Sequence, residues 1–233
     1  MFVDPFLFHP STILLIPALI LTIYAQSKVS GTYSRYARIR SRSGLTGADV
    51  ARMILDENGL YDVKVEQVAG NLTDHYDPRV HAVRLSSNVY NSTSIAAIAV
   101  AAHETGHAVQ HADGYTPLKI RSAFVPVASF GSQVGPFLIL LGLFIPQMPI
   151  LLTIGIYAFA FAVLFQVVTL PVEYNASSRA LAFLGQNGII SGYEEMDGAK
   201  KMLNAAALTY VAAALTAILT LLRFVWIAQG RDE

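Results

Sequence analysis

Cysteine is absent from this chain of 233 residues, and charged residues are scarce at 14%. The lack of cysteine excludes disulfide scaffolds, thiolate zinc sites and cysteine nucleophiles. Lys and Arg together number 16, as do Asp and Glu, so the zero net charge gives no support for nucleic-acid binding. Soluble domains contain about 25% charged residues. This deficit, together with 54% hydrophobic residues and a mean hydropathy of +0.47, indicates a membrane protein.

Long apolar stretches are the main feature that is present. A helix needs about 20 apolar residues to cross a bilayer. Four stretches meet or approach this length, at about 6–24, 124–145, 149–170 and 205–227. The second contains Gly and Pro, so we expect a kinked helix there, and whether it crosses the bilayer completely stays open. The sequence therefore predicts a mainly α-helical membrane protein with about four transmembrane helices, forming one membrane-embedded domain over 1–233.

Basic residues indicate how these spans are oriented. Segments 28–121 and 172–201 contain 14 of the 16 Lys and Arg residues. By the positive-inside rule, both segments face the cytoplasm and both termini lie outside. The basic residues follow the first apolar stretch instead of preceding it, so that stretch is a retained span and not a signal peptide. We expect a multi-pass protein of the cell membrane.

The longer polar segment, 28–121, has the size of a small domain. Thr46 and Ser94 are typical helix N-caps, and Gly59 and Gly114 are typical helix ends. The expected elements are a helix over 46–59, strands over 62–67 and 80–85, a turn over 74–78, and a helix over 95–114. This pattern predicts a small cytoplasmic α+β part beside the spans.

The second of these helices carries the sequence His103-Glu104-Thr105-Gly106-His107, an H-E-x-x-H motif. Two histidines four residues apart lie on one face of a helix, so both imidazoles can reach one metal ion. Glu104 is placed to take a proton from zinc-bound water. Gly106 costs the helix about 1 kcal/mol relative to Ala, which suggests that another backbone or a substrate approaches there.

A catalytic zinc usually has three protein ligands, and three residues compete for the third position. His111 lies on the same helix, but about 12 Å along the axis from His103, so it cannot share an ion with both histidines. Asp113 would reach the ion only if the chain turned sharply after His107. Glu173 follows the third apolar span, and a carboxylate beside a span is a functional candidate.

Three segments resemble the YugP-like family of membrane zinc metallopeptidases: Thr73–Pro78, Ser94–His111 and Leu170–Tyr174. The resemblance extends over nearly the whole chain. It implies one Zn²⁺ per chain bound by His103, His107 and Glu173, with Glu104 as the general base. More remotely, the motifs are similar to the HtpX and CAAX-prenyl endopeptidase group. The α+β part is therefore expected to be zincin-like.

Other residues are candidates for supporting roles. Candidates to stabilise an oxyanion or bind substrate are His75, Tyr76, Tyr174 and Arg179. Candidates to support the metal ligands from outside are Asn175, Asp74 and Asp77. The remote group often has an acidic residue four positions after the ligand Glu, where this chain has Ser177. The strand 81–85 is a candidate to pair with an extended substrate.

The sequence thus predicts a zinc-dependent membrane endopeptidase that cleaves membrane-associated proteins or peptides at the cytoplasmic surface. Its expected partners are these substrates, the lipid bilayer, and a candidate regulatory membrane protein or second copy of the chain; nucleic acid is not expected. The alternatives are a zinc-binding membrane scaffold, a peptidase that stays inactive until a partner binds, and a zinc transporter. Transporters bind ions near the bilayer midplane, which the basic segment around the motif disfavours.

Overall fold

The computed structural model describes residues 9–145 and 147–230. Residues 6–8 of the first expected span, the two ends of the chain and Pro146 lie outside this description. The chain divides into two compact units. The apolar unit comprises the described residues up to Ala25, Ile120–Leu170, and those from Thr209 onward. The α+β unit comprises Gln26–Lys119 and Pro171–Leu208.

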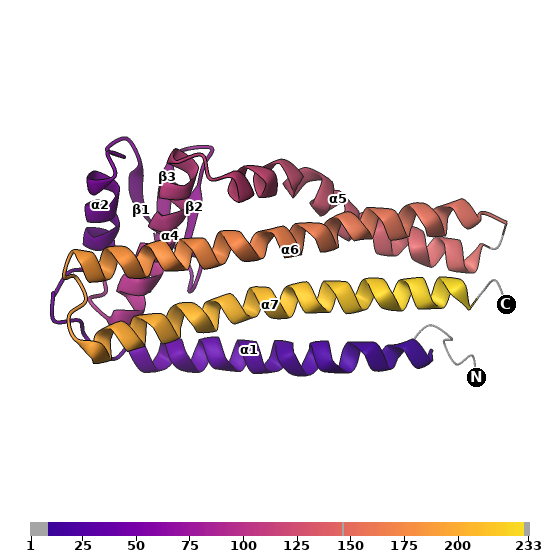
Figure 1. The fold of residues 1–233 in the computed structure, drawn as a ribbon, viewed down its shortest axis with the longest axis horizontal. Coiled ribbons are helices and arrows are strands. Elements are labelled where there is room, and N and C mark those ends of the chain that lie inside the picture. Colours follow the sequence, from indigo (N-terminus) through magenta and orange to yellow (C-terminus); the bar gives the residue numbers. More distant parts are fainter. Residues whose placement is uncertain (1–8, 146, 231–233) are drawn as a thin grey trace. The chain divides into compact units, whose positions relative to one another are not determined.

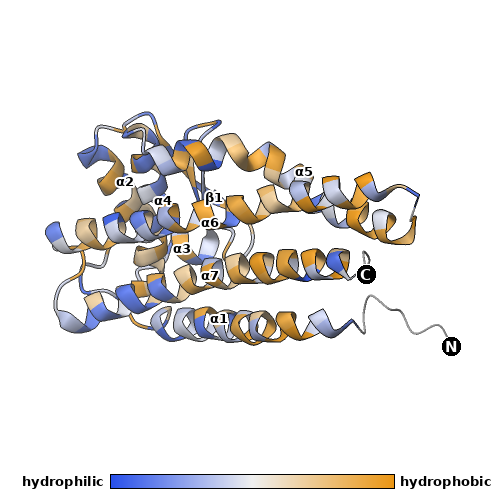
Figure 2. Ribbon diagram, turned by 45° about the vertical axis from the view of Figure 1, so that its right-hand side comes forward, coloured by the Kyte–Doolittle hydropathy of each residue, from blue (hydrophilic) through white to orange (hydrophobic). Residues whose placement is uncertain are grey.

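Four helices are long and apolar enough to cross a membrane. They are α1 (Leu15–Tyr36, preceded by a 3-10 turn, Pro10–Leu14), α5 (Thr116–Phe144), α6 (Pro149–Gln186) and α7 (Tyr193–Gln229). Each helix extends beyond the apolar stretch that predicted it. Figure 2 shows hydrophobic residues concentrated along parts of these helices. The expectation of a mainly helical protein with four candidate spans is confirmed.

Within the apolar unit, glycines allow α5 and α6 to approach each other closely. A Cβ atom on Gly131 would overlap the Ala158 carbonyl oxygen, and one on Gly142 would overlap the Leu152 backbone nitrogen. Small residues at such contacts let two apolar helices pack backbone to backbone. The second expected span is a single helix in the structure, with Pro126 and Pro136 inside it.

The α+β unit contains a small sheet and three further helices. They are α2 (Gly47–Glu57), β1 (Lys64–Val68), β2 (His75–Asp77), β3 (Ala82–Ser86), α3 (Ser87–Tyr90) and α4 (Ile95–Ala112). The strand order is β1-β3-β2, with β3 parallel to β1 and antiparallel to β2. The predicted turn over 74–78 is wrong, because residues 75–77 pair with β3. A three-residue strand is too short for side-chain alternation to reveal it.

Capping and burial explain why α4 forms where it does. The Ser94 side chain accepts a hydrogen bond from the Ala97 backbone N–H at the start of the helix. Gly114, with φ +65°, follows its end in the left-handed conformation that glycine adopts readily. Between these ends most residues are buried, and α4 packs against α2 and the sheet (Figure 1). The helix with the motif therefore forms the centre of this unit.

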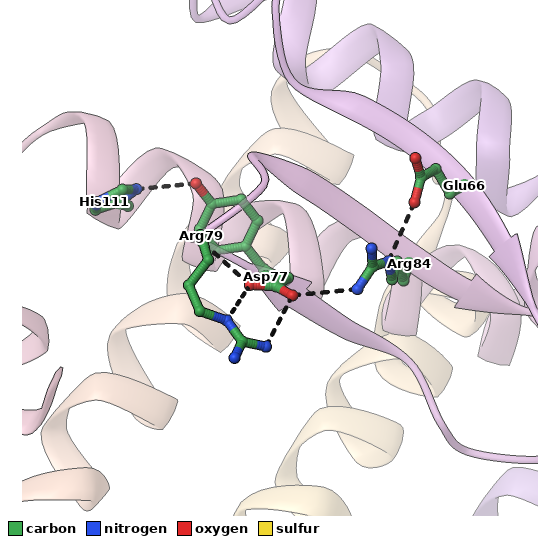
Figure 3. A network of polar contacts seen from close by, with 6 residues as sticks. Glu66, Asp77, Arg79, Arg84 and His111 are labelled. Carbon is green, nitrogen blue, oxygen red and sulfur yellow. Dashed lines mark hydrogen bonds and ion pairs between the residues drawn. The ribbon is translucent and has the colours of Figure 1, made fainter. Parts of the chain in front are cut away.

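Charged side chains link the three strands (Figure 3). The Arg84 guanidinium on the central strand donates to Glu66 on β1 at 3.1 Å and to Asp77 on β2 at 3.1 Å. Asp77 also accepts hydrogen bonds from the backbone and side chain of Arg79. These hydrogen bonds and the two positive charges lower the pKa of Asp77 to about 2. Asp77 thus adds an ion pair between β2 and the central strand.

Candidate metal centre

Three ligand-type side chains converge inside the α+β unit. The ligand atoms of His103, His107 and Glu173 all lie within 4.8 Å of one another, and all three residues are buried. One Glu173 carboxylate oxygen lies 3.2 Å from His103 Nε2 and 3.5 Å from His107 Nε2. Two imidazoles and one carboxylate are a donor set that zinc binds in hydrolases. Among residues 9–145 and 147–230, this is the group that meets the geometry of a metal site.

Two helices supply these ligands. Residues four apart on α4 present both imidazoles on one face, and their ring centroids are 4.8 Å apart. Glu173 comes from α6, 70 residues further along the chain than His103. Gly106 lies where the helices meet, because a Cβ atom there would lie 2.9 Å from the Ala176 carbonyl oxygen of α6. The glycine in the motif thus admits another backbone.

Each histidine has a second partner at its other ring nitrogen. His103 Nδ1 lies 3.1 Å from the Ser177 hydroxyl, and His107 Nδ1 lies 3.0 Å from the Gln110 side-chain oxygen. Metal-binding histidines usually have such a partner, which orients the ring. Both Nε2 atoms are thereby turned toward Glu173. Ser177 occupies the supporting position where the remote family group has an acidic residue.

Glu104 follows the first histidine and is partly exposed. Desolvation by the surrounding protein raises the pKa of its carboxyl group, and the charges of Glu173 and Asp74 raise it further, while His103 and His107 oppose this shift. A carboxyl group with a raised pKa beside a metal site has the chemistry of a general base.

The four candidates for oxyanion stabilisation have different surroundings. His75 is exposed and donates to the Thr73 carbonyl oxygen at 2.8 Å. The Tyr76 hydroxyl lies 2.9 Å from His111 Nδ1, and Tyr174 is 50% exposed. Arg179 donates to Asn175 and forms an ion pair with Asp113. The contacts of Tyr76 and Arg179 thus join neighbouring elements.

The three candidates to support the metal ligands also differ in their hydrogen-bond partners. Asn175 belongs to the hydrogen-bond network around His107, because its side-chain oxygen accepts from Gln110 at 2.9 Å. Asp74 accepts from the backbone and the hydroxyl of Ser86, while Asp77 belongs to the network of the sheet. Asp113, the competing third ligand, is the C-cap residue of α4.

The expectation that the strand over 81–85 pairs with an extended substrate is wrong. This strand corresponds to β3, which pairs with β1 along one edge and with β2 along the other. Residues 82–84 are therefore paired on both edges, and β3 has no free edge along this stretch to which a substrate strand could add.

Sequence reasoning missed two residues of the site. Gln110 entered the argument only as the residue found where a related motif has glycine, and Ser177 only as a departure from the remote group. The available signal was helical spacing, because Gln110 is three residues after His107 and Ser177 is four after Glu173. The contact of Ser177 with His103 depends on how α6 packs against α4.

Comparisons with known proteins identify the family of the chain. Residues 11–229 match the model of a protein family described as "Putative neutral zinc metallopeptidase". The chain is also 52% identical over 221 residues to "Putative membrane protease YugP" of Bacillus subtilis (strain 168), which covers 94% of this chain and 97% of that protein. No solved structure matches the chain.

Proposed function

Because the chain belongs to this family of zinc metallopeptidases, the YugP-like family, we propose that it is a zinc-dependent membrane endopeptidase. In this proposal His103, His107 and Glu173 bind one Zn²⁺ and Glu104 is the general base. The observation that carries it is the convergence of the three ligand-type side chains within 4.8 Å in a buried position.

The protein side chains have separate tasks in peptide-bond hydrolysis. Zinc, when bound, supplies Lewis acidity toward the scissile carbonyl and lowers the pKa of a water molecule. Glu104 accepts the proton of the attacking water and returns it to the leaving amine. His75, Tyr76, Tyr174 and Arg179 are the proposed candidates to stabilise the oxyanion.

The proposed substrates are membrane-associated proteins or peptides. Four helices of this chain are long and apolar enough to cross a bilayer, and Glu173 lies on one of them, α6. Two residues, Pro171 and Val172, separate Glu173 from Leu170, the last residue of the third expected span. We place the site at the cytoplasmic surface, with both termini outside, because 28–121 and 172–201 contain most of the basic residues.

The test compares Glu104→Gln and Glu173→Ala with the wild-type chain in detergent. Glu104→Gln is expected to retain one zinc per chain and to lose cleavage of a membrane-protein substrate, because the amide cannot accept the proton. Glu173→Ala is expected to lose zinc. A chelator should stop wild-type cleavage, and added zinc should restore it.

Two results would contradict parts of this proposal. Cleavage by zinc-loaded Glu104→Gln would remove Glu104 as the base, and unchanged zinc affinity of Glu173→Ala would remove Glu173 as a ligand. Wild-type protein that binds zinc but cleaves no substrate, alone or with membrane partners, would instead identify a zinc-binding scaffold.

A further inference from the structure

The side chain of Gln110 is completely buried on α4, three residues after His107. It makes three hydrogen bonds. Its oxygen lies 3.0 Å from His107 Nδ1, and its nitrogen donates to the Val172 carbonyl oxygen and to the Asn175 side-chain oxygen, both at 2.9 Å. All the surrounding acceptors and donors come from α4 and from the part of α6 beside Glu173.

This set of partners determines the orientation of the Gln110 amide. A backbone carbonyl oxygen only accepts hydrogen bonds, so the group that faces Val172 must be the amide nitrogen. The amide oxygen then faces His107, and it also only accepts. His107 must therefore carry its hydrogen on Nδ1, which leaves the lone pair of Nε2 on the side of Glu173.

Asn175 is itself held in place. Its side-chain oxygen accepts a second hydrogen bond from Arg179 Nε at 2.9 Å, and the Arg179 guanidinium pairs with Asp113 at the end of α4. The chain of contacts runs from α4 to α6 and back to α4. Two of the three groups that fix Gln110, the Val172 carbonyl and the Asn175 side chain, are not metal ligands themselves.

His103 has a weaker constraint. Its Nδ1 lies 3.1 Å from the Ser177 hydroxyl, and a hydroxyl rotates and can either donate or accept. Ser177 is therefore compatible with either neutral form of that ring, whereas Gln110 permits one neutral form of His107.

We propose that Gln110 is a positioning residue, which holds His107 in the Nδ1–H form so that Nε2 faces the metal. This inference rests on the proposed zinc site and goes beyond it, because it assigns the selection of the ligand form to a residue outside the motif. The loss of an outer partner typically lowers metal affinity about 10–100-fold.

The first experiment measures zinc affinity by chelator competition on full-length protein in detergent. Gln110→Met keeps the side-chain length but cannot accept the His107 N–H, so its affinity should fall about 10–100-fold. Gln110→Glu keeps an acceptor and loses the donors to Val172 and Asn175, so its affinity should lie between those of wild type and Gln110→Met. Thr169→Val is the control, because Thr169 is also buried and its hydroxyl donates to the Phe165 carbonyl oxygen of its own helix, outside the motif.

The order of affinities separates positioning from a general structural role. Both Gln110 variants lose the donors to α6, so a structural role alone predicts equal losses, and equal losses would overturn the proposal. Wild-type affinity in Gln110→Met would also overturn it while the zinc site itself stands. A wild-type chain that binds no zinc would overturn the proposed function and this inference together.

A second measurement uses the wild-type protein alone, so it does not depend on whether a variant folds. In ¹⁵N-labelled, chelator-treated wild-type protein at alkaline pH, where the ring is neutral, an NMR spectrum should show the His107 hydrogen on Nδ1, because without zinc only its protein partners select the form of the ring. A hydrogen on Nε2 of His107 would overturn the proposal.

Discussion

Gly106→Ala offers a direct test of the close approach of α4 and α6. In an open helix this substitution stabilises by about 1 kcal/mol, because Ala loses less backbone entropy than Gly. Here the new Cβ atom would lie 2.9 Å from the Ala176 carbonyl oxygen and 3.4 Å from its carbonyl carbon. A backbone cannot move aside as a side chain can, and overpacking of this kind costs about 1–3 kcal/mol. The net expectation ranges from no change to a loss of about 2 kcal/mol.

Gly31→Ala is the matched control. Gly31 lies inside α1, and a Cβ atom there would have no other atom within 4 Å. This variant should gain the helix-propensity term alone, about 0.5–1 kcal/mol. Since both variants share that term, the difference between them isolates the packing cost of about 1–3 kcal/mol.

Thermal unfolding in detergent and zinc affinity are the two measurements. For a chain of this size, 1 kcal/mol corresponds to about 2–4 °C in Tm. Gly106→Ala should also bind zinc more weakly, because moving α4 away from α6 separates His103 and His107 from Glu173. If Gly106→Ala gains as much stability as Gly31→Ala and keeps its zinc affinity, the close approach has been misjudged.

Three further predictions concern stability. Thr46→Ala should destabilise by about 1 kcal/mol, measured by thermal unfolding, because Thr46 and Asp49 form a capping box at the start of α2; an unchanged Tm would show that this cap contributes nothing. The pKa of Asp77 is about 2, lowered by its hydrogen bonds to Arg79 and by the charges of Arg79 and Arg84. Its native pKa is below the unfolded value of about 3.9, so its stabilisation is present above pH about 4 and is lost as pH falls toward 2. In pH-dependent unfolding, Asp77→Asn should reduce this acid sensitivity, and an equally steep loss would assign it to other carboxylates. Zinc at about 100 times its Kd should stabilise the wild type by about 2.7 kcal/mol relative to chelator-treated protein, and Glu173→Ala should lose most of that Tm difference.

Local signals predicted a large part of this structure. The caps at Thr46 and Ser94 and the glycines that follow the two helices placed α2 and α4 within a few residues. The apolar stretches located the four long helices, although each helix continues into polar sequence, because helical hydrogen bonding does not depend on hydrophobicity. The short strand β2 was missed, because its hydrogen bonds are made with β3 and three residues carry little pattern of their own.

By itself, the amino-acid sequence determined that two histidines share one helical face, because residues four apart lie one turn from each other. It also determined that long apolar helices accompany that motif. Local spacing left the third ligand open, and beyond the family resemblance only the tertiary structure brings Glu173 to the histidines, since its contact with His103 spans 70 residues. The same packing decided that Gln110 and Ser177 hold the two rings, because such contacts depend on where α6 meets α4 and not on neighbours along the chain.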